Sequence, residues 1–600
     1  MKRPVLALTC ILAVAWLPGL VAQTPGGKAQ ALGLTATHDE AGRWAEATLK
    51  TLPLERKVAQ MICEQMRGEY VPEDSDRFQY WVRLARDYGI GGFVVYGGSP
   101  LETAHLLNRL QKEAKVPLLI SADFEGGPGQ QFAGATEFPG NMALSAAGSE
   151  ELAYQEGKVG AREGRAIGIQ VTYSPSVDIQ TRPDNPVLSV RSFGADLDVL
   201  GRLAGAYIRG YQENGMLATA KHFPGRGDVE LIAGTEFTIN RKPAEQVERE
   251  DFLAFKKAIE AGVAFVMSEH IAVPSLTNGS DLPASVDRTL ATVWLREKLG
   301  FAGLLTSDDL WYEKMTKRFG AVKTGVLAVQ AGHDVLLKPA DAVEMIGGVV
   351  ESVRSGEIPE TRIDQSVRRI LYWKARLNLH RNRFVDESRV AAVVGAREHQ
   401  QVLRAIADRS LTLLVNRQFF PTTGQTIGSI AHVVIQKSDH EPAAVIVADK
   451  LKGAFRVTRT IVLRPNVDPA QYYEALRATA AADTVVVSVF SQRTAYRDNG
   501  PLRDADWRLV ADMVRIKPRS TVVMSYGNPY VVESLKDATA VVVGYGEGGF
   551  YGNQTVFADA FIRLLKGEIA PHGRLPVAVS KQFPIGSGLV YGVTTSQWRP

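Results

Sequence analysis

Ionisable residues follow short apolar runs at several places between residues 117 and 338. They comprise carboxylates and cations: Asp123, Asp178, Lys221, His222, Glu269, His270, Asp308, Asp309 and Lys338. Burying charged groups without partners is expensive, so the alternative to one polar pocket would be a series of separate structural ion pairs. A ring of such groups at one edge of a fold predicts a pocket for a polar ligand.

Two chemistries compete for Lys221. A lysine at a strand end forms a Schiff base when a desolvated site depresses its pKa, and the many polar neighbours here disfavour that. In the other interpretation Lys221 and His222 donate hydrogen bonds to sugar hydroxyls, and Asp123 accepts hydrogen bonds from a pair of sugar hydroxyls. Asp308 is then a candidate nucleophile of a retaining glycosidase, which needs a second carboxyl about 5–5.5 Å away.

The elements that must position these residues alternate from about residue 58 onwards. The strand-like runs are Val58–Cys63, Gly91–Tyr96, Pro117–Ala122, Gln170–Tyr173, Ala218–His222, Ala264–Ser268, Gly303–Ser307 and Asp334–Lys338. Apolar spacing of i, i+3, i+4 predicts helices between them, over Leu101–Lys115, Glu150–Ala166, Val199–Asn214, Ala244–Ala261, Leu290–Leu299 and Gly320–Ala331. Eight units over about 280 residues predict a (β/α)8 barrel, in which chemistry sits where strands end. A doubly wound sheet is the alternative.

A second α/β pattern begins near residue 405, after a long amphipathic helix and connector over 357–380. Its strand-like runs are Leu411–Val415, His432–Gln436, Ala443–Val447, Thr458–Leu463, Thr484–Val489, Thr521–Ser525 and Thr539–Val543, with helices over Gln471–Ala481 and Ala505–Ile516. The predicted fold class is α/β: a (β/α)8 TIM-like barrel followed by an α/β sandwich. We divide the chain into a leader (1–31), the barrel (32–356), a helical connector (357–404) and the sandwich (405–600).

Composition excludes several classes of protein. The chain has 600 residues, of which 45% are hydrophobic and 22% charged, so disorder is not its dominant state. The formal net charge is +4, and no run of Lys and Arg with interleaved aromatic residues indicates a nucleic-acid partner.

The N-terminus is typical of an export signal. Lys2 and Arg3 precede an apolar stretch from Val5 to Ala22, and cleavage is expected after Ala22 or Ala31. A retained membrane anchor is the alternative, but Pro18-Gly19 and the polar stretch that follows favour cleavage; no later segment is apolar enough to span. We therefore expect an exported protein, periplasmic or extracellular. Cleavage leaves Cys63 without a disulfide partner, and its apolar surroundings indicate a buried thiol.

Several motifs point to one family. They are Lys221-His222-Phe223-Pro224-Gly225, Asn185-Pro186 with Arg191-Ser192-Phe193-Gly194, Asp123-Phe124-Glu125-Gly126-Gly127, His270-Ile271-Ala272-Val273-Pro274, Ser307-Asp308-Asp309-Leu310 and the C-terminal Gly573-Arg574-Leu575-Pro576-Val577. Together they resemble family 3 of the glycoside hydrolases, and most closely its bacterial β-N-acetylglucosaminidase branch. The resemblance implies a carbohydrate substrate, Asp308 as nucleophile, and Asp123, Arg191, Lys221 and His222 as sugar contacts in the −1 subsite. A β-glucosidase of the same family is the alternative activity.

The chain departs from this branch at the proton donor. The branch carries an Asp-x-His dyad on the loop after the Lys-His-Phe-Pro-Gly motif, and here Ile232 and Gly234 stand at those positions. Three explanations remain open. Glu236 or Glu230 on the same loop replaces the histidine, with Glu236 as the preferred acid/base, or a C-terminal residue such as Asp498 or Glu547 reaches in. The third explanation is a glycan-binding protein without turnover.

No metal or cofactor is expected. The ten histidines are scattered, and none pairs with another at ligand spacing. His333 is expected to be a packed, hydrogen-bonded histidine. Gly544-Tyr545-Gly546-Glu547-Gly548-Gly549 matches a dinucleotide fingerprint, but it lies near the chain's end and lacks the acidic residue about 20 positions further on.

Overall fold

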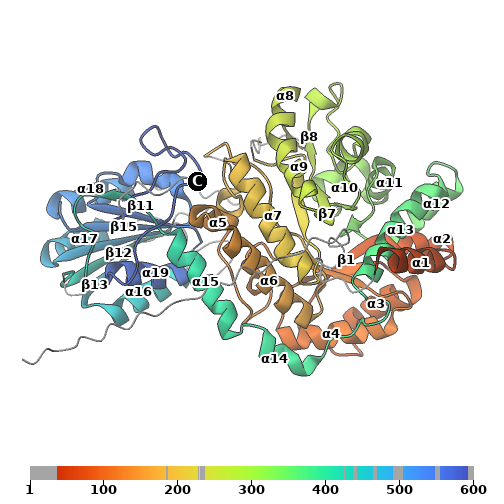
Figure 1. Cartoon of the computed structure of the whole chain (residues 1–600), viewed down its shortest axis with the longest axis horizontal. Helices are drawn as coiled ribbons and strands as arrows, with labels where there is room; N and C mark the ends of the chain where they lie inside the picture. Colours follow the sequence, from red (N-terminus) through yellow and green to blue (C-terminus); the bar gives the residue numbers. More distant parts are fainter. Residues whose placement is uncertain are drawn as a thin grey trace, which may run out of the picture.

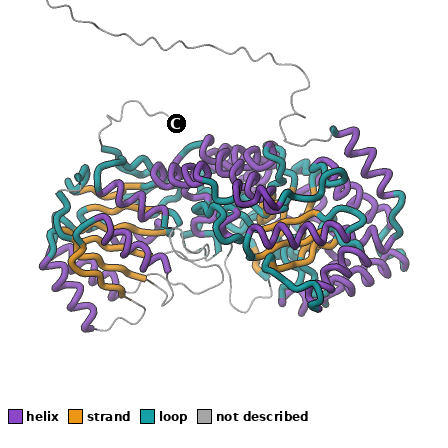
Figure 2. Tube along the Cα trace, turned by 90° about the horizontal axis from the view of Figure 1, so that it is seen from below, coloured by secondary structure: helices purple, strands orange, loops and turns teal. Residues whose placement is uncertain are grey.

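The computed structural model describes residues 37–183, 185, 187–227, 229, 237–423, 426–436, 442–463, 469–490, 504–546 and 555–591. These residues form two α/β bodies that lie side by side (Figure 1, Figure 2). Among them, we find no helix with both the length and the apolar character needed to cross a bilayer. The expected leader, residues 1–31, lies outside the described residues.

Eight parallel strands form the barrel in the predicted order. They are β1 (Ile62–Arg67), β2 (Gly92–Tyr96), β3 (Leu119–Ala122), β4 (Val171–Thr172), β5 (Thr219–Phe223), β7 (Phe265–Ser268), β9 (Leu304–Ser307) and β10 (Leu336–Leu337). Hydrogen bonds join β10, β1, β2, β3 and β4 into one sheet and β5, β7 and β9 into another. Single parallel bridges, Val171 to Leu217 and Thr306 to Val335, connect the two sheets at both seams. The ring is therefore closed, and the doubly wound alternative is wrong.

Helices follow the strands and cover the outside of the ring. They are α3 (Asp76–Arg83) continuing into η1 (Leu84–Tyr88), α4 (Pro100–Glu113), α5 (Asn141–Ala147) with α6 (Glu150–Ile167), α7 (Leu197–Glu213), α8 (Ala244–Val247) with η4 (Glu248–Phe252) and α9 (Leu253–Glu260), η6 (Thr289–Lys298), α10 (Glu313–Phe319) with α11 (Ala321–Ala331), and α12 (Ala342–Arg354). The longer ones, such as α6, α7 and α12, each bury an apolar face.

Helix α7 shows how the sequence specifies these elements. The side chain of Asp196 accepts from the amides of Asp198 and Val199 and so caps the helix N-terminus. The buried positions include Leu200, Leu203, Ala204, Tyr207, Ile208 and Tyr211, spaced as one helical face requires. Glycines let α7 approach α6 closely: a Cβ on Gly210 would lie 2.2 Å from the Tyr154 carbonyl oxygen.

One predicted barrel strand is misplaced. Val58–Cys63 was expected to be a strand, but α2 spans Leu54–Gln60 and β1 begins at Ile62. Leu54-Glu55-Arg56-Lys57 is a strong helix-forming stretch behind Pro53, and it draws the apolar Val58 and Ala59 into the helix. Cys63 is buried, as predicted, and burial raises the pKa of its thiol to about 11.

The second body is a mostly parallel six-stranded sheet in the order β11-β16-β15-β14-β12-β13. The strands are β11 (Thr412–Asn416), β12 (Ile430–Gln436), β13 (Val457–Leu463), β14 (Thr484–Phe490), β15 (Thr521–Tyr526) and β16 (Ala540–Gly544), and only β11 runs antiparallel to its neighbour. Helices cover both faces (Figure 1): α16 (Pro442–Ala454) packs beside α19 (Val556–Leu565), and α17 (Pro469–Ala481) packs beside α18 (Asp504–Ile516). This is the predicted α/β sandwich.

The strand predicted over Ala443–Val447 is wrong, because this run is the start of α16. Its buried residues, including Ala444, Val447, Ala448 and Leu451, recur at helical spacing. A short apolar run is ambiguous by itself, and here the residues that follow continue the helical face.

A helical connector joins the two bodies. Helix α13 (Glu360–Arg376) packs on α1 (His38–Leu49) beside the barrel, and α15 (Arg397–Ser410) leads into β11. The sandwich also contacts the loop after β4, where the amide of Ala195 donates to the Pro576 carbonyl at 3.0 Å. The side chain of Gln180 in the same loop donates to the Tyr530 hydroxyl at 3.4 Å. The sandwich therefore supports the loop that carries Arg191.

Candidate active site

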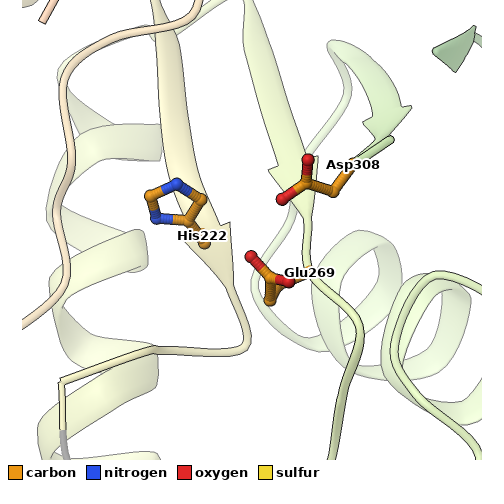
Figure 3. Close-up of side chains that lie close together, drawn as sticks. All are labelled: His222, Glu269 and Asp308. Atoms are coloured by element: carbon orange, nitrogen blue, oxygen red, sulfur yellow. The ribbon is translucent and has the colours of Figure 1, made fainter. Parts of the chain in front are cut away.

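Two carboxylates stand at matching positions on adjacent barrel strands. Ser268 ends β7 and Ser307 ends β9, and these two residues are register partners. Glu269 and Asp308 each follow directly, and the Asp308 amide donates to the Ser268 carbonyl at 2.8 Å. Figure 3 shows these two carboxylates close together, with the ring of His222 beside them. The carboxyl ends of the strands thus form the site that the sequence predicts.

A cavity of about 310 Å³ opens at this end of the barrel. Its lining combines ionisable groups with aromatic and aliphatic side chains: Asn185, Val187, Arg226, Val229, Phe237, Thr238, Glu269, His270, Ile271, Asp308, Asp309, Trp311 and Tyr312. Tyr312 stacks on His270 with ring planes 6° apart. A pocket with a few convergent polar groups among apolar walls is typical of a small-molecule site.

Glu125 is the hub of the ion pairs beside this cavity. Its two oxygens accept from Nε and Nη2 of Arg191 at 2.6 and 2.7 Å. The Nζ of Lys221 lies 2.5 Å from Glu125 and 3.0 Å from Oδ1 of Asp123. Burial raises the pKa of Glu125, but the charges of Arg191 and Lys221 outweigh it and hold this pKa well below its usual range. Burial lowers the pKa of Lys221, and the charges of Asp123 and Glu125 more than offset it. Lys221 is therefore a fixed cation, which argues against the Schiff-base interpretation.

The environment of His222 favours the neutral imidazole. Burial and the nearby charges of Arg226 and Lys221 hold its pKa well below the usual value. Nδ1 lies 2.7 Å from Oδ2 of Asp178, while Nη1 of Arg226 lies 3.3 Å from Nε2. Both ring nitrogens thus have partners within the protein.

Asp308 is held as a carboxylate. Burial raises its pKa, but the charge of Arg226, whose Nη2 lies 3.5 Å from Oδ2, and that of His270 bring the net value below the usual one. Oδ1 accepts from the amide of Asp309 at 2.8 Å. An ionised, oriented carboxylate is the state that a nucleophile requires.

Asp309 has a different environment from its neighbour. Its Oδ2 lies 2.7 Å from Nζ of Lys338. Burial and the charge of Asp308 raise its pKa to about 6. Lys338 also donates to the hydroxyl of Tyr96 at 3.3 Å. The two adjacent aspartates are thus distinguished by their partners, Arg226 for one and Lys338 for the other.

The structure brings together most of the residues that the sequence predicts. Asp123, Arg191 and Lys221 share the Glu125 network, and His222 joins Asp308 through Arg226. Their roles toward a substrate stay predictions. The proposed acid Glu236 and its alternatives Glu230, Asp498 and Glu547 lie outside the described residues.

Two residues at the centre of the site received no role from the sequence. Arg226 contacts Glu269 and lies near both Asp308 and His222. The sequence places Glu269 at a strand end and indicates no function for it. The signal for Arg226 is its position between Gly225 and Gly227, on the loop that follows the Lys221-His222-Phe223 strand end. His333 is packed as predicted, with Nε2 2.6 Å from the Ser268 hydroxyl.

One cluster in the described part of the chain has metal-ligand spacing. The donor atoms of His222, Glu269 and Asp308 lie within 4.8 Å of one another. The guanidinium of Arg226 contacts Glu269 and approaches the other two, so this protein supplies its own cation at that place. The donor set is therefore better explained as an ion-paired active site than as a metal centre.

Comparison with known proteins agrees with this geometry. Residues 54–372 match the family model "Glycosyl hydrolase family 3 N terminal domain", and residues 315–587 match the corresponding C-terminal domain. A β-N-acetylglucosaminidase/β-glucosidase of Cellulomonas fimi is 32% identical over 384 residues, covering 63% of this chain and 67% of that protein. A β-hexosaminidase of Thiobacillus denitrificans is 32% identical over 274 residues, or 44% of this chain and 74% of that one. The solved family 3 β-N-acetylglucosaminidase from Paenibacillus sp. str. FPU-7 superposes with a TM-score of 0.75 at 28% identity, covering 88% of this chain and 99% of its own.

Proposed function

The chain belongs to glycosyl hydrolase family 3 and is a β-glycosidase, and we propose that it is a retaining β-N-acetylhexosaminidase with Asp308 as its nucleophile. The observation that carries the proposal is the environment of Asp308. This carboxylate lines the cavity at the end of β9, is ionised beside Arg226, and is oriented by the amide of Asp309. Attack of Asp308 on the anomeric carbon forms a covalent glycosyl-aspartate, which water then hydrolyses with net retention.

The Glu125 network supplies the groups for sugar recognition. Asp123 keeps a side-chain exposure of 24%, whereas Glu125 and Lys221 are almost fully buried. We assign Asp123 and Lys221 to sugar hydroxyls, with Arg191 and His222 completing the −1 subsite. Because both ring nitrogens of His222 have protein partners, its contact with a sugar replaces the one with Arg226.

The names of the relatives support N-acetylglucosamine as the sugar. The Cellulomonas protein is named for both N-acetylglucosaminidase and glucosidase activity, and this keeps a β-glucosidase as the second candidate. The non-catalytic alternative rests on the absent Asp-x-His dyad. We favour turnover because Asp308 is intact and charged beside the sugar contacts. Glu236 as proton donor stays a prediction.

We also propose export to the periplasm or the extracellular space, on the strength of the N-terminal residues 1–31. Expression of the full chain with a C-terminal tag, followed by fractionation and N-terminal sequencing, tests this. A shortened N-terminus in the exported fraction supports export. Full-length protein confined to the cytoplasm contradicts it.

A panel of aryl glycosides tests the activity. Wild type should release nitrophenol fastest from the β-N-acetylglucosaminide, and Asp308→Ala should abolish release from every sugar. Proton NMR should show the β-anomer as the first product. If wild type binds the sugars, seen as a raised melting temperature, but releases nothing, the enzyme assignment fails and the binding protein is the better explanation.

A further inference from the structure

The spacing of Glu269 and Asp308 is set by the barrel itself. Ser268 and Ser307 are paired in register on neighbouring parallel strands, and each carboxylate comes one residue later. Neighbouring strands lie about 4.8 Å apart in any sheet. Glu269 and Asp308, one residue after the Ser268–Ser307 pair, therefore start from nearly the spacing of neighbouring strands. The conformation of the surrounding loops does not set this spacing.

That spacing is compatible with a retaining mechanism. Carboxylate oxygens of Glu269 and Asp308 lie within 4.8 Å of each other. Retaining glycosidases hold their two carboxyl groups about 5–5.5 Å apart, whereas inverting enzymes need roughly 6.5–9.5 Å to admit a water. The pair is too close for inversion and suited to retention.

The other carboxylates beside the cavity are bound elsewhere. Asp123 pairs with Lys221, Asp178 with His222, and Asp309 with Lys338. Glu125 joins Arg191 and Lys221. Glu269 lines the cavity together with Asp308, and its partner Arg226 is one that it shares with the nucleophile.

We propose that Glu269 is the acid/base partner of Asp308. The inference rests on the proposed function and adds the residue that its chemistry needs. In the first step the Glu269 carboxyl gives its proton to the glycosidic oxygen, the bond from that oxygen to the anomeric carbon breaks, and Asp308 bonds to this carbon. In the second step Glu269 takes a proton from water, the water oxygen bonds to the anomeric carbon, and Asp308 leaves as a carboxylate.

Arg226 balances the charges through this cycle. One guanidinium faces two carboxylates, so a proton on Glu269 leaves the three groups neutral overall while Asp308 stays ionised. Neutrality matters here because charge in excess is costly in a buried site. In the glycosyl-enzyme Asp308 is an uncharged ester, and Arg226 then pairs with Glu269 as the carboxylate that activates water.

Leaving-group dependence tests this role on the purified full chain. The sugar is the one that wild type hydrolyses best, carried on dinitrophenol and on a second sugar. Glu269→Ala should lose about 10²–10⁴-fold in kcat/KM on the disaccharide, the usual contribution of a general acid. On the dinitrophenyl glycoside the loss should be much smaller, with a burst of dinitrophenol as the glycosyl-enzyme accumulates. Added azide should raise the steady-state rate of Glu269→Ala and yield the β-glycosyl azide.

Two matched variants sharpen the result. Glu236→Ala tests the competing assignment, and Glu351→Gln is a control that removes an exposed carboxylate on α12, outside the cavity lining. Azide rescue of Glu236→Ala instead of Glu269→Ala overturns the inference. Equal losses of kcat/KM by Glu269→Ala on both substrates, without azide rescue, also overturn the inference. Glu269→Gln is the control that shows such a loss is not due to misfolding. If the wild-type protein hydrolyses none of the glycosides, the proposed function itself is refuted.

Discussion

The Nδ1 nitrogen of His222 lies 2.7 Å from Oδ2 of Asp178, and this contact determines which ring nitrogen carries the proton. Nδ1 donates to the carboxylate, which leaves the lone pair of Nε2 to accept from Nη1 of Arg226 at 3.3 Å. Asp178 also accepts from the backbone amide of Arg226 at 2.7 Å. A fully buried aspartate therefore positions both the ring and the loop that bring a cation to Asp308.

Substitution of Asp178 should impair activity through Arg226. Asp178→Asn places an amide group where backbone donors now point, so we expect at least a tenfold loss of kcat/KM, about 1.4 kcal/mol in transition-state stabilisation. Ser176→Ala is the matched control, because it removes only one bond to Asp178, of 2.8 Å. Steady-state kinetics on an aryl glycoside checks this. Equal activity of Asp178→Asn and wild type would show that the pair has no positioning role.

Loss of the Glu125 hub should destabilise the barrel. Glu125→Gln removes the counter-charge that Arg191 and Lys221 share and leaves Lys221 with Asp123 as its remaining carboxylate; breaking such a buried pair costs about 3–5 kcal/mol in the free energy of unfolding. Glu313→Gln removes an exposed pair with Lys317 and should leave the free energy of unfolding almost unchanged. Denaturant unfolding measures both. Similar small changes in the two variants would contradict the assignment of Glu125 as the hub.

Glu64 should make stability depend on pH. Burial raises its pKa from 4.5 to about 7, so the folded state holds a proton that the unfolded state releases. This contribution is complete below pH 4.5 and is lost as pH rises through 7; it amounts to at most about 3 kcal/mol. Glu64→Gln should remove it, so the gap in melting temperature between variant and wild type widens in favour of the variant from pH 4.5 to pH 7. A gap independent of pH would argue against a protonated Glu64.

Gly227 should be intolerant of a side chain. A Cβ at this position would lie 1.4 Å from the Ile179 carbonyl oxygen, and the other near atoms are also Ile179 backbone, so no flexible side chain is there to move aside. Gly227→Ala should displace the loop that carries Arg226 and lower kcat/KM at least tenfold. Gly42→Ala is the control: its Cβ meets nothing within 4 Å, and it should stabilise α1 by up to about 1 kcal/mol. Activity and melting temperature of the two variants distinguish steric displacement from a general effect of alanine.

The strand predictions succeeded where an apolar run is followed directly in the sequence by the polar residues that end it. Gly92–Tyr96 and Leu304–Ser307 lie within one or two residues of the expected strands, because a polar loop follows each run directly. Val58–Cys63 and Ala443–Val447 failed, since short apolar runs suit a helix or a strand and their flanking residues decide the outcome.

Sequence alone determined the order of strands in the barrel, the rim on which the ionisable residues stand and, through its motifs, the family; the role of Asp308 stays a prediction. These depend on neighbours along the chain, where apolar periodicity and strand ends are encoded. Only the tertiary structure decided that Glu125 links Arg191 to Lys221, that Arg226 stands between His222 and Asp308, and that Glu269 faces Asp308. Except for the contact between His222 and Arg226, these contacts join residues that lie dozens of positions apart, and they exist because closing the ring sets the register of each strand against the next.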